Sequence, residues 1–501
     1  MCTKNLADKQ GMAILDALQE AERLGIKLAV WKNRNKIEES LSGGFNIDVL
    51  VQEKDKTSFE SILHKFDFFE ADSRHKSFPG ITHYFRLTAG EPLHIHVYFR
   101  LVTGESSLKE YDLPLVDYVL WQTFKDQTFG ISVANDQAAV YLFILRHYLK
   151  SGSLLGRRGY KKKVVEEKED FGVNDDMLMS AKFASDPLGI VPLIKKEEIA
   201  GGGIPSLAAA LRMKWYLRSY QRRSSLYFAF KRNLPVILNK LGIEQSIKQK
   251  KKLLKPTGAV IAITGTEATG KSTMVDKVVN NLGRQFEVVY AHVGKPPVFI
   301  SLFVGALVRI LKWARKEGNS AYSEKKCGEP EGAAENRPDA GFVRRLFNAV
   351  KALEVAFSRL VLTRLLTKKA RRGLVVITDR WPSMEPGKMD GARINPDDGL
   401  IERLAFGCEI WMYNKMPAAD LAIILSVPLE VALKRNAQRD KLGKETSDQV
   451  IARHSNNRHA LPKAKKIERY SNEGSLDTSF IDIIEIINEQ LAKFPQNSRI
   501  Q

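Results

Sequence analysis

The segment Gly265–Ser272 constrains this chain most, because it joins an apolar run to a helical pattern through a glycine-rich turn. It reads Gly-Thr-Glu-Ala-Thr-Gly-Lys-Ser, which matches the P-loop pattern GxxxxGK[ST] in full. Glycines permit a tight turn in which successive backbone N–H groups point at phosphate oxygens. The helix that begins near Lys271 adds the positive end of its dipole. The segment therefore predicts a phosphate-binding loop between a buried strand and a helix.

The loop also predicts which cofactors the chain uses. Lys271 can reach the terminal phosphates of a nucleoside triphosphate, and the Ser272 hydroxyl can ligate Mg²⁺. We therefore expect ATP and Mg²⁺ as cofactors, and a glycine-rich turn without a ligand is the disfavoured alternative. The expected cofactor-binding residues are Gly265, Thr266, Glu267, Ala268, Thr269, Gly270, Lys271, Ser272 and Thr273.

The pattern around this loop predicts an α/β domain over residues 256–501. Strands and helices alternate, which is typical of a parallel sheet with helices on both faces. A segment at 316–340, rich in Glu, Gly, Ala and Lys, predicts a mobile insert. The expected strands are Ala259–Thr264, Glu287–Val293, Leu374–Thr378 and Leu421–Val427, and the expected helices include Lys271–Leu282 and Leu429–Arg439.

The first half of the chain predicts two further regions. Residues 8–115 begin with a helical pattern and continue with strand-like apolar runs, which indicates an α+β unit. Residues 134–245 show helical periodicity and form a helical connector region. The lysine-rich segment Lys248–Lys255 is interpreted as a linker. The strand-like runs are Lys27–Trp31, Asn46–Val51 and Leu93–Phe99.

Composition limits the class of protein. A length of 501 residues predicts several domains. The formal charge of +20 could belong to a solvated basic surface, or it could serve to bind one of three partners. These partners are nucleic acid, an anionic membrane surface, and anionic small substrates. No uncharged apolar run reaches about eighteen residues, so we expect no membrane span. Met1–Gln10 lacks an apolar core and predicts no secretory signal. Three widely spaced cysteines fit a reducing cytoplasm.

Two later segments make the C-terminal half resemble a known family. Val375–Trp381 is a buried run that ends in Asp-Arg-Trp, and Leu425–Leu433 is followed by Lys434, Arg435 and Arg439. Together with the P-loop, this combination resembles the thymidylate kinase branch of the nucleoside monophosphate kinases. The resemblance extends from about Gly258 to the C-terminus.

The resemblance implies a role for particular residues. Glu267 would lie near the acceptor sugar, Asp379 would help order Mg²⁺ and its waters, and Arg380 would hold the acceptor phosphate. Arg435 and Arg439 lie where the family's lid helix begins, and one would neutralise charge on the transferring phosphoryl group. The expected catalytic residues are thus Lys271, Asp379, Arg380, Arg435 and Arg439, and the expected metal ligands are Ser272 and Asp379.

Two departures from the family leave the acceptor open. The family often places Glu before the first P-loop glycine, where this chain has Thr264. After the Asp-Arg-Trp triplet come Pro382–Met384 and then Asp390–Arg393, without the usual acceptor-base segment. The sequence therefore predicts a phosphorylated small-molecule acceptor without naming it.

The N-terminal unit resembles the uncharacterised nucleotidyltransferase-like domains, on Trp31–Asn33, Gly43–Val51 and His94–Val97. Active transferases need two carboxylates two residues apart on a strand, where they share metal ions. Here Asn46 occupies the first position and Asp48 the second. We therefore expect a degenerate unit without transferase activity, or one that binds a nucleotide without turnover. His94 and His96 share a strand face as metal ligands or, the favoured alternative, as ordinary strand histidines.

The favoured hypothesis is ATP-dependent phosphoryl transfer to a phosphate-bearing acceptor, most simply a nucleoside monophosphate, in a cytoplasmic protein. One alternative is a regulatory or scaffold protein that binds ATP without transferring phosphate. Another is a nucleic-acid-associated NTPase, which the basic charge suggests. Nucleic acid is the less favoured partner, since the sequence shows no zinc site and no tandem aromatic stacking pattern.

Overall fold

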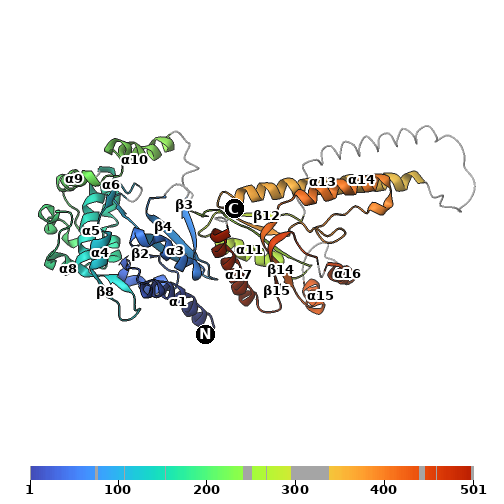
Figure 1. Ribbon diagram of the computed structural model, residues 1–501, viewed down its shortest axis with the longest axis horizontal. Coiled ribbons are helices and arrows are strands. Elements are labelled where there is room, and N and C mark those ends of the chain that lie inside the picture. Colours follow the sequence, from blue (N-terminus) through green and yellow to red (C-terminus); the bar gives the residue numbers. More distant parts are fainter. Residues whose placement is uncertain are drawn as a thin grey trace, which may run out of the picture. The chain divides into compact units, whose positions relative to one another are not determined.

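A computed structural model describes residues 2–73, 77–105, 108–152, 154–240, 251–266, 268–294, 338–438, 446–457 and 460–497 (Figure 1). The chain divides into two compact units. Unit 1 comprises Met1–Thr257, Asn281–Glu287 and Ile481–Gln501. Unit 2 comprises Gly258–Asn280 and Val288–Phe480.

Unit 1 is built on a mixed eight-stranded sheet. The pairs β5–β2 and β1–β9 are parallel, and the other neighbours are antiparallel. A separate hairpin joins β6 (Leu101–Thr103) to β7 (Tyr111–Leu113). The strands of the large sheet, in spatial order, are β10 (Lys252–Leu254), β3 (Phe69–Ser73), β4 (Ile81–Arg86), β5 (Leu93–Tyr98), β2 (Ile47–Val51), β1 (Leu28–Lys32), β9 (Ser132–Ala134) and β8 (Thr123–Lys125).

Both faces of this sheet are buried, which explains its continuous apolar runs. Successive side chains of a strand point to opposite faces. Val49 of β2 packs in the cluster formed with α1 (Cys2–Arg23) and α3 (Lys56–Lys65). Leu50 packs in the other cluster, with α5 (Asp136–Ser151). The α+β expectation for the first unit is confirmed.

Short helices surround α5 on its side of the unit. The Asn135 side chain caps α5 by accepting from the Ala138 N–H at 2.9 Å, and Ser206 caps α9 in the same way. Residues 136–240 are mostly helical, as their periodicity indicates. The remaining helices of this unit are α2 (Ile37–Leu41), α4 (Val116–Trp121), α6 (Leu154–Lys161), α7 (Val164–Asp170), α8 (Asp175–Ser180), α9 (Leu207–Tyr216) and α10 (Ser225–Lys240).

The interpretation of Lys248–Lys255 as a linker is wrong for its described part. Residues 248–250 lie outside the described residues, but Lys252–Leu254 forms β10, the edge strand beside β3. Leu253 and Leu254 are buried. The flanking lysines obscured these two leucines, whose burial against the sheet outweighs the polar composition around them.

Unit 2 is built on a five-stranded sheet in which every pair is parallel. The four predicted strands are all present, within two residues of their expected ends. The fifth, β15, lies at the edge and is mostly half-buried, so its many charged residues gave no strand signal. In spatial order the strands are β12 (Val288–His292), β13 (Val375–Asp379), β11 (Val260–Gly265), β14 (Ala419–Ser426) and β15 (Ala464–Ser471).

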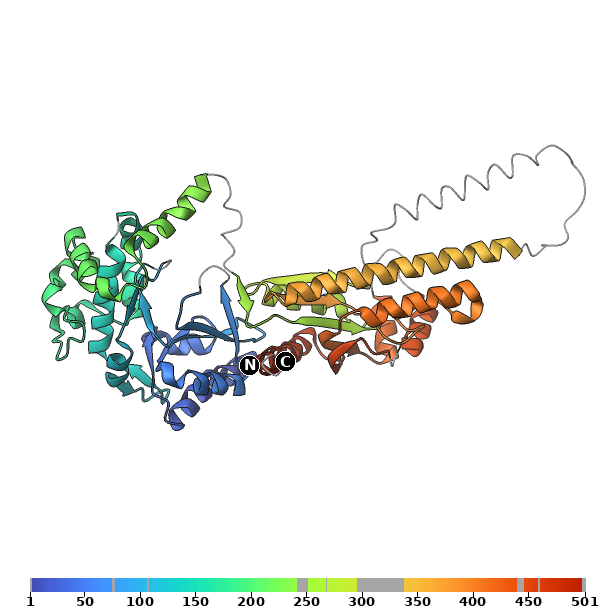
Figure 2. The same cartoon turned by 45° about the horizontal axis from the view of Figure 1, so that its top comes forward.

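Helices cover both faces of this sheet, which confirms the predicted fold class. The chain crosses from β11 to β12 in one direction and returns to β13 in the other. Right-handed crossovers therefore put α11 and α13 on opposite faces. Figure 2 shows α13 and α14 running side by side. The helices are α11 (Lys271–Leu282), α13 (Pro338–Ala370), α14 (Leu400–Lys415), α15 (Leu429–Ala437) and α16 (Ser447–Asn457), while α17 (Leu476–Asn497) begins in unit 2 and lies mostly in unit 1.

The expected insert at 316–340 falls mainly outside the described residues, which omit 316–337. Residues 338–340 begin α13, with Pro338 at its first position. Among the described helices, none combines the length and the apolar character needed to cross a bilayer.

The assignment of β10 to unit 1 predicts a stability effect. Leu254→Ala should lower the free energy of unfolding of this unit by about 2–5 kcal/mol, because it leaves a cavity under the edge strand. Urea unfolding of the full chain measures the change. The control is Lys251→Ala, one residue before β10 and exposed. If the Leu254 variant is as stable as this control, the segment is better interpreted as a linker than as a packed strand.

Candidate functional site

The candidate site lies at the carboxyl ends of three neighbouring strands in unit 2. Asp379, the last residue of β13, pairs in register with Ile263 of β11 on one side and His292 of β12 on the other. The phosphate-binding loop follows β11 directly. In parallel sheets, ligands bind in the crevice outside these strand ends, so the topology brings the predicted loop and the Asp-Arg pair to one edge.

The loop has the backbone that its glycines predict. Gly265 has φ 145°, and a Cβ on it would lie 2.3 Å from the Leu425 carbonyl oxygen of β14. Gly270 has φ 86°. Ala268 is also left-handed, at φ 59°, which is uncommon for a residue other than glycine. Such conformations cluster at ligand-binding loops, where surrounding contacts hold them.

Internal hydrogen bonds hold the loop in shape. The Thr269 hydroxyl donates to the Thr266 carbonyl at 2.9 Å, and the Lys271 ammonium donates to the same carbonyl. The Asn472 amide donates to the Thr269 carbonyl at 2.7 Å. Lys271 is buried, whereas Ser272 and Thr273 are exposed at the start of α11. The lysine that is predicted to reach the phosphates thus lies under the loop.

Asp379 fits a role beside Mg²⁺. Its Oδ2 contacts His292 Nδ1 at 3.1 Å, while its Oδ1 is buried without a hydrogen-bond partner in the described part of the chain. A buried carboxylate oxygen without a partner is costly unless a ligand satisfies it. Carboxylate and hydroxyl oxygens are ligands that Mg²⁺ accepts, directly or through water. Asp379 and Ser272 therefore fit the ion.

Arg380 begins a chain of charges that leads away from the strand end. Its guanidinium lies 3.5 Å from Asp390 Oδ2, and Arg359 lies 2.8 Å from Asp390 Oδ1. Arg380 and Asp390 both have left-handed backbones, with φ of 75° and 63°. Two arginines share this one carboxylate. A guanidinium group is a donor that suits an anionic ligand such as a phosphate.

Arg359 is the structural anchor of this cluster. It is fully buried on α13, and its five N–H groups all find acceptors. They donate to the carbonyls of Val293, Gly294 and Asp390, to Asp390 Oδ1 and to the Tyr413 hydroxyl, at 2.7–3.3 Å. Gly294 also makes room for the neighbouring arginine, because a Cβ there would lie 2.5 Å from Arg380 Cδ.

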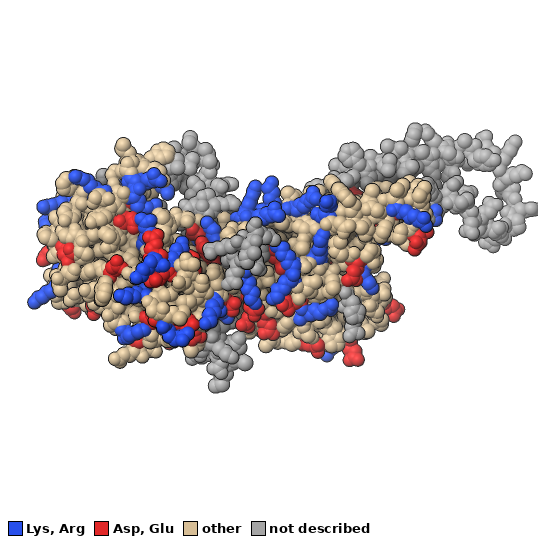
Figure 3. All heavy atoms as spheres, in the orientation of Figure 1, with Lys and Arg blue, Asp and Glu red and all other residues tan. Residues whose placement is uncertain are grey.

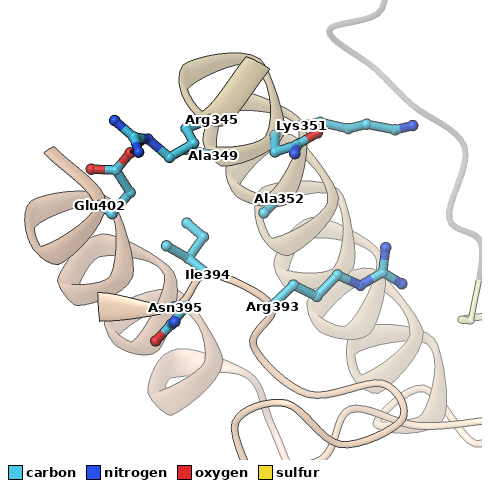
Figure 4. Close-up of a pocket in the computed structure, with 9 residues that line it drawn as sticks. Arg345, Ala349, Lys351, Ala352, Arg393, Ile394, Asn395 and Glu402 are labelled. Carbon is cyan, nitrogen blue, oxygen red and sulfur yellow. Dashed lines mark ion pairs between the residues drawn. The ribbon is translucent and has the colours of Figure 1, made fainter. Parts of the chain in front are cut away.

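A pocket of about 370 Å³ lies between α13 and α14 (Figure 4). Ala349, Ala352 and Ile394 provide its apolar part. Arg345 and Glu402, which both line it, form an ion pair at 3.4 Å. Its remaining lining residues are Asn348, Lys351, Arg393 and Asn395. The loop that carries Asp390 continues into this pocket through Arg393.

Two predicted residues cannot be placed. Glu267 and Arg439 lie outside the described residues, as do residues 440–445, which follow Arg439. Arg435 is half-buried near the end of α15, which stops at Ala437 rather than at the predicted Arg439. After the undescribed segment, α16 returns to the loop, where His454 Nε2 lies 2.9 Å from the Thr266 hydroxyl oxygen.

Sequence reasoning missed Arg359, Asp390, His292, His454 and Asn472 as parts of this site. From the sequence, Asp390 is recognised only as part of a departure from the family pattern, and it has no predicted role. His292 ends a predicted strand, and strand ends in parallel sheets are where sites form, so a signal existed there. Arg359 gave none, because a cation within a helix is usually a solvated residue.

Unit 1 holds a second polar cluster, around Asp48. Its carboxylate accepts from Asn33 and Asn46 at 3.0 and 2.7 Å, and its other oxygen lies 2.8 Å from His96 Nδ1. Burial raises the pKa of Asp48. Protein donors already occupy the carboxylate, which favours the prediction that this unit performs no nucleotidyl transfer.

The strand histidines form a stack of rings. His83 stacks on His96, with ring centroids 4.1 Å apart, and its Nδ1 lies 2.9 Å from His94 Nε2. Burial lowers the pKa of His94 to about 3 and lowers those of His83 and His96 as well, so these rings are neutral near pH 7. No group of three or more metal-ligating side chains occurs among the described residues. The ordinary-histidine alternative therefore agrees with the structure.

Lys109 lies near this cluster. Its ammonium lies over the rings of Phe78 and Tyr98, at 4.9 and 5.1 Å, and forms no ion pair with a described carboxylate. Burial, reinforced by the Arg146 guanidinium, lowers the pKa of Lys109 to about 7. Its protonated form is therefore disfavoured in the folded unit.

Comparison with known proteins adds little to this geometry. No protein-family model matches the sequence, and no curated protein sequence matches it. Solved structures similar to part of the chain include a thymidylate kinase from Candida albicans, at 15% identity over 47% of this chain and 94% of that chain, with a TM-score of 0.27. A sugar kinase from Janibacter sp. HTCC2649 has 12% identity over 45% and 91%, with a TM-score of 0.22.

A third similar structure, TT1252 from Thermus thermophilus, has 19% identity over 46% of this chain and 98% of that chain, with a TM-score of 0.22. At these identities and TM-scores the matches carry no argument about substrate or mechanism. The α/β fold class rests instead on the parallel sheet and on the glycine-rich loop after its central strand.

The buried position of Arg359 predicts a large stability effect. Arg359→Leu should lower the free energy of unfolding of unit 2 by about 3–5 kcal/mol, because it leaves Asp390 buried without its nearest partner. The control on the same helix is Arg345→Leu, whose half-exposed ion pair should contribute less than about 1 kcal/mol. Chemical denaturation measures both. Equal losses would show that the Arg359 network is not the anchor.

The lowered pKa of Lys109 predicts a pH dependence. Between pH 7 and 10 the unfolded chain holds a proton on this lysine that the folded unit has released, so stability rises with pH there by at most about 1.4 kcal/mol per unit. Lys109→Met should remove that contribution. Urea unfolding from pH 6 to 9 tests it, with exposed Lys54→Met as control. The idea fails if both variants keep the wild-type slope.

Proposed function

We propose that unit 2 binds ATP with Mg²⁺ and transfers the terminal phosphoryl group to a phosphate-bearing small molecule, most simply a nucleoside monophosphate. An oxygen of the acceptor phosphate would attack the γ-phosphorus while the bond to the leaving ADP oxygen breaks. The observation that supports this most is the Asp379–Arg380 pair at the end of β13, beside the loop that follows β11. One side chain suits the metal and the other suits an anionic acceptor.

The proposed roles divide the charge of the reaction. Lys271 would neutralise the terminal phosphates, and Arg380 would hold the acceptor phosphate. Ser272 and Asp379 would hold Mg²⁺, which supplies further neutralisation of phosphate charge when it is bound. Such transfer depends on positioning and charge neutralisation more than on covalent chemistry. Arg435 and Arg439 would contribute from the lid segment.

The Arg380–Asp390 contact suggests how the acceptor part of the site responds to ligand. In the chain alone, Asp390 balances part of the charge of Arg380. An acceptor phosphate would compete for that guanidinium, while Arg359 keeps Asp390 in place through its second oxygen. The left-handed backbones of Arg380 and Asp390 hold the two side chains in this arrangement.

The alternative of an ATP-binding scaffold requires binding without turnover. A thermal-shift screen of nucleotides, sugars and sugar phosphates with Mg-ATP separates the two, because a true acceptor stabilises the fold by mass action. Compounds that stabilise unit 2 are then tested for phosphorylation by ADP release. Stabilisation by ATP without phosphorylation of any compound would favour the scaffold.

The loop assignment predicts that Lys271→Met lowers turnover by about a hundredfold or more, because it removes one positioned charge from the phosphates. The control is Lys277→Met on the same helix, whose ammonium forms an ion pair with Asp477 outside the loop. Coupled ADP-release assays measure turnover, and thermal shifts with Mg-ATP measure binding. Wild-type activity and binding in the Lys271 variant would contradict the proposed function.

A further inference from the structure

One segment of the chain combines many cations with a complete lack of acidic residues. It belongs neither to the candidate site in unit 2 nor to the polar cluster around Asp48. Residues 199–243 contain eight Lys and Arg residues and no Asp or Glu. Within this stretch, α9 and α10 belong to unit 1. Large apolar side chains alternate with the cations along both helices. This composition is typical of a surface that meets an anionic and partly apolar partner.

The inward-facing side chains of the two helices pack against the rest of unit 1 or form ion pairs with it. Met213 and Leu217 lie in the core of unit 1, and Phe228 is buried beneath α10. Arg232, four residues after Phe228, forms ion pairs with Glu105 and Glu110, at 2.8 and 3.2 Å. This inner row fixes which side of each helix faces outward.

Apolar side chains fill the outer faces. On α10, Leu226 and Phe230 are 83% and 62% exposed and lie one turn apart, opposite the buried Phe228. On α9, Leu211 and Trp215 have the same spacing, and Trp215 is 65% exposed. We call the exposed leucine, tryptophan and phenylalanine side chains of these two pairs the apolar stripe, and their contact with water is unfavourable. Tyr227 of α10 is exposed beside it.

Exposed cations lie in the same segments of the sequence as these apolar side chains. Arg212, Arg218, Arg223 and Lys231 are exposed, and none of the four forms an ion pair with a described carboxylate. The Arg218 guanidinium lies 4.3 Å from the Trp215 ring centroid. Figure 3 shows Lys and Arg atoms, in blue, among tan atoms over the region of α9 and α10 at the upper left.

We propose that the α9–α10 surface, defined by Leu211, Arg212, Trp215, Arg218, Arg223, Leu226, Phe230 and Lys231, docks on an anionic lipid bilayer. The four cations would lie at the headgroup phosphates, while the apolar stripe enters the boundary between headgroups and acyl chains. Tryptophan beside arginine suits that boundary, where one side of the residue is apolar and the other wet.

Other partners fit this surface less well. Two copies of an acid-free basic face would repel each other across a symmetric interface. The phosphates of a duplex nucleic acid would pair with the cations. They would form no favourable contact with Leu211 and Leu226, whose side chains cannot stack on bases. An anionic bilayer satisfies both the charge and the aliphatic side chains. This inference concerns unit 1 and stands apart from the proposed phosphoryl transfer.

The test measures binding of the full chain to vesicles by flotation at about 0.1 M salt. Wild type should bind vesicles that contain phosphatidylserine in phosphatidylcholine, and bind phosphatidylcholine alone much more weakly. Arg223→Gln with Lys231→Gln should weaken binding by about 25-fold, since each cation near an anionic surface contributes about fivefold. The charge-matched control is Lys54→Gln with Lys182→Gln, both exposed in unit 1; it should retain binding.

The apolar stripe is tested separately. Trp215→Ser with Phe230→Ser should weaken binding by about tenfold or more, because each ring loses its burial in the boundary. The control is Trp121→Ser, which removes a 76% exposed tryptophan elsewhere in unit 1. Circular dichroism verifies that all variants are folded. Equal binding to both vesicle types, or wild-type binding in both double variants, would overturn the proposal. So would binding to duplex DNA or RNA that the same variants abolish, in the absence of vesicle binding.

Discussion

The candidate site depends on the burial of β11 between β13 and β14. All six residues of this strand are buried, and both of its neighbours run parallel to it. Gly265 ends the strand where the Leu425 carbonyl leaves no space for a side chain. The chain must therefore turn sharply there, and the helix that follows presents its N-terminus at the same edge of the sheet. Phosphate binding would use N–H groups that this packing has already exposed.

Parallel pairing then determines which other residues meet the loop. Because all five strands run in one direction, their carboxyl ends share one edge, and residues far apart in the sequence become neighbours. Asp379 lies between β11 and β12 in register. The backbone beyond Asp379 is not regular, so packing from α13 is needed to hold it. Arg359 supplies that support through acceptors on the loops after β12 and β13.

Unit 1 contains two groups of charged residues, one in its interior and one on its surface. In the interior, Glu167 forms ion pairs with Arg146 and Lys150, and burial keeps the stacked histidines neutral. On the α9–α10 surface, cations remain without acidic neighbours and lie beside exposed rings. The positive net charge of the chain is therefore unevenly distributed, and part of it lies where an anionic partner can reach it. The same residue types have opposite consequences in these two places, because burial penalises unpaired charge and water does not.

Local patterns in the sequence determined much of the fold and part of the site. The apolar run before Gly265, the glycine spacing and the helical periodicity after Lys271 lie within one short segment, so the strand, loop and helix could be predicted together. The Asp379–Arg380 pair could be proposed because it ends a recognisable strand. The edge strands β10 and β15 escaped notice, because lysines flank the two buried leucines of β10 and because the half-buried β15 carries many charged residues.

Other features were decided by tertiary structure, because they join residues with no local relationship. Arg359 and Asp390 are 31 positions apart, and nothing in a long amphipathic helix marks one arginine as the buried one. The contact of His454 with the loop spans 188 positions. The sequence by itself determined that a phosphate-binding loop follows a buried strand. Tertiary packing decided which charges surround that loop, because desolvation depends on every element that closes around a side chain.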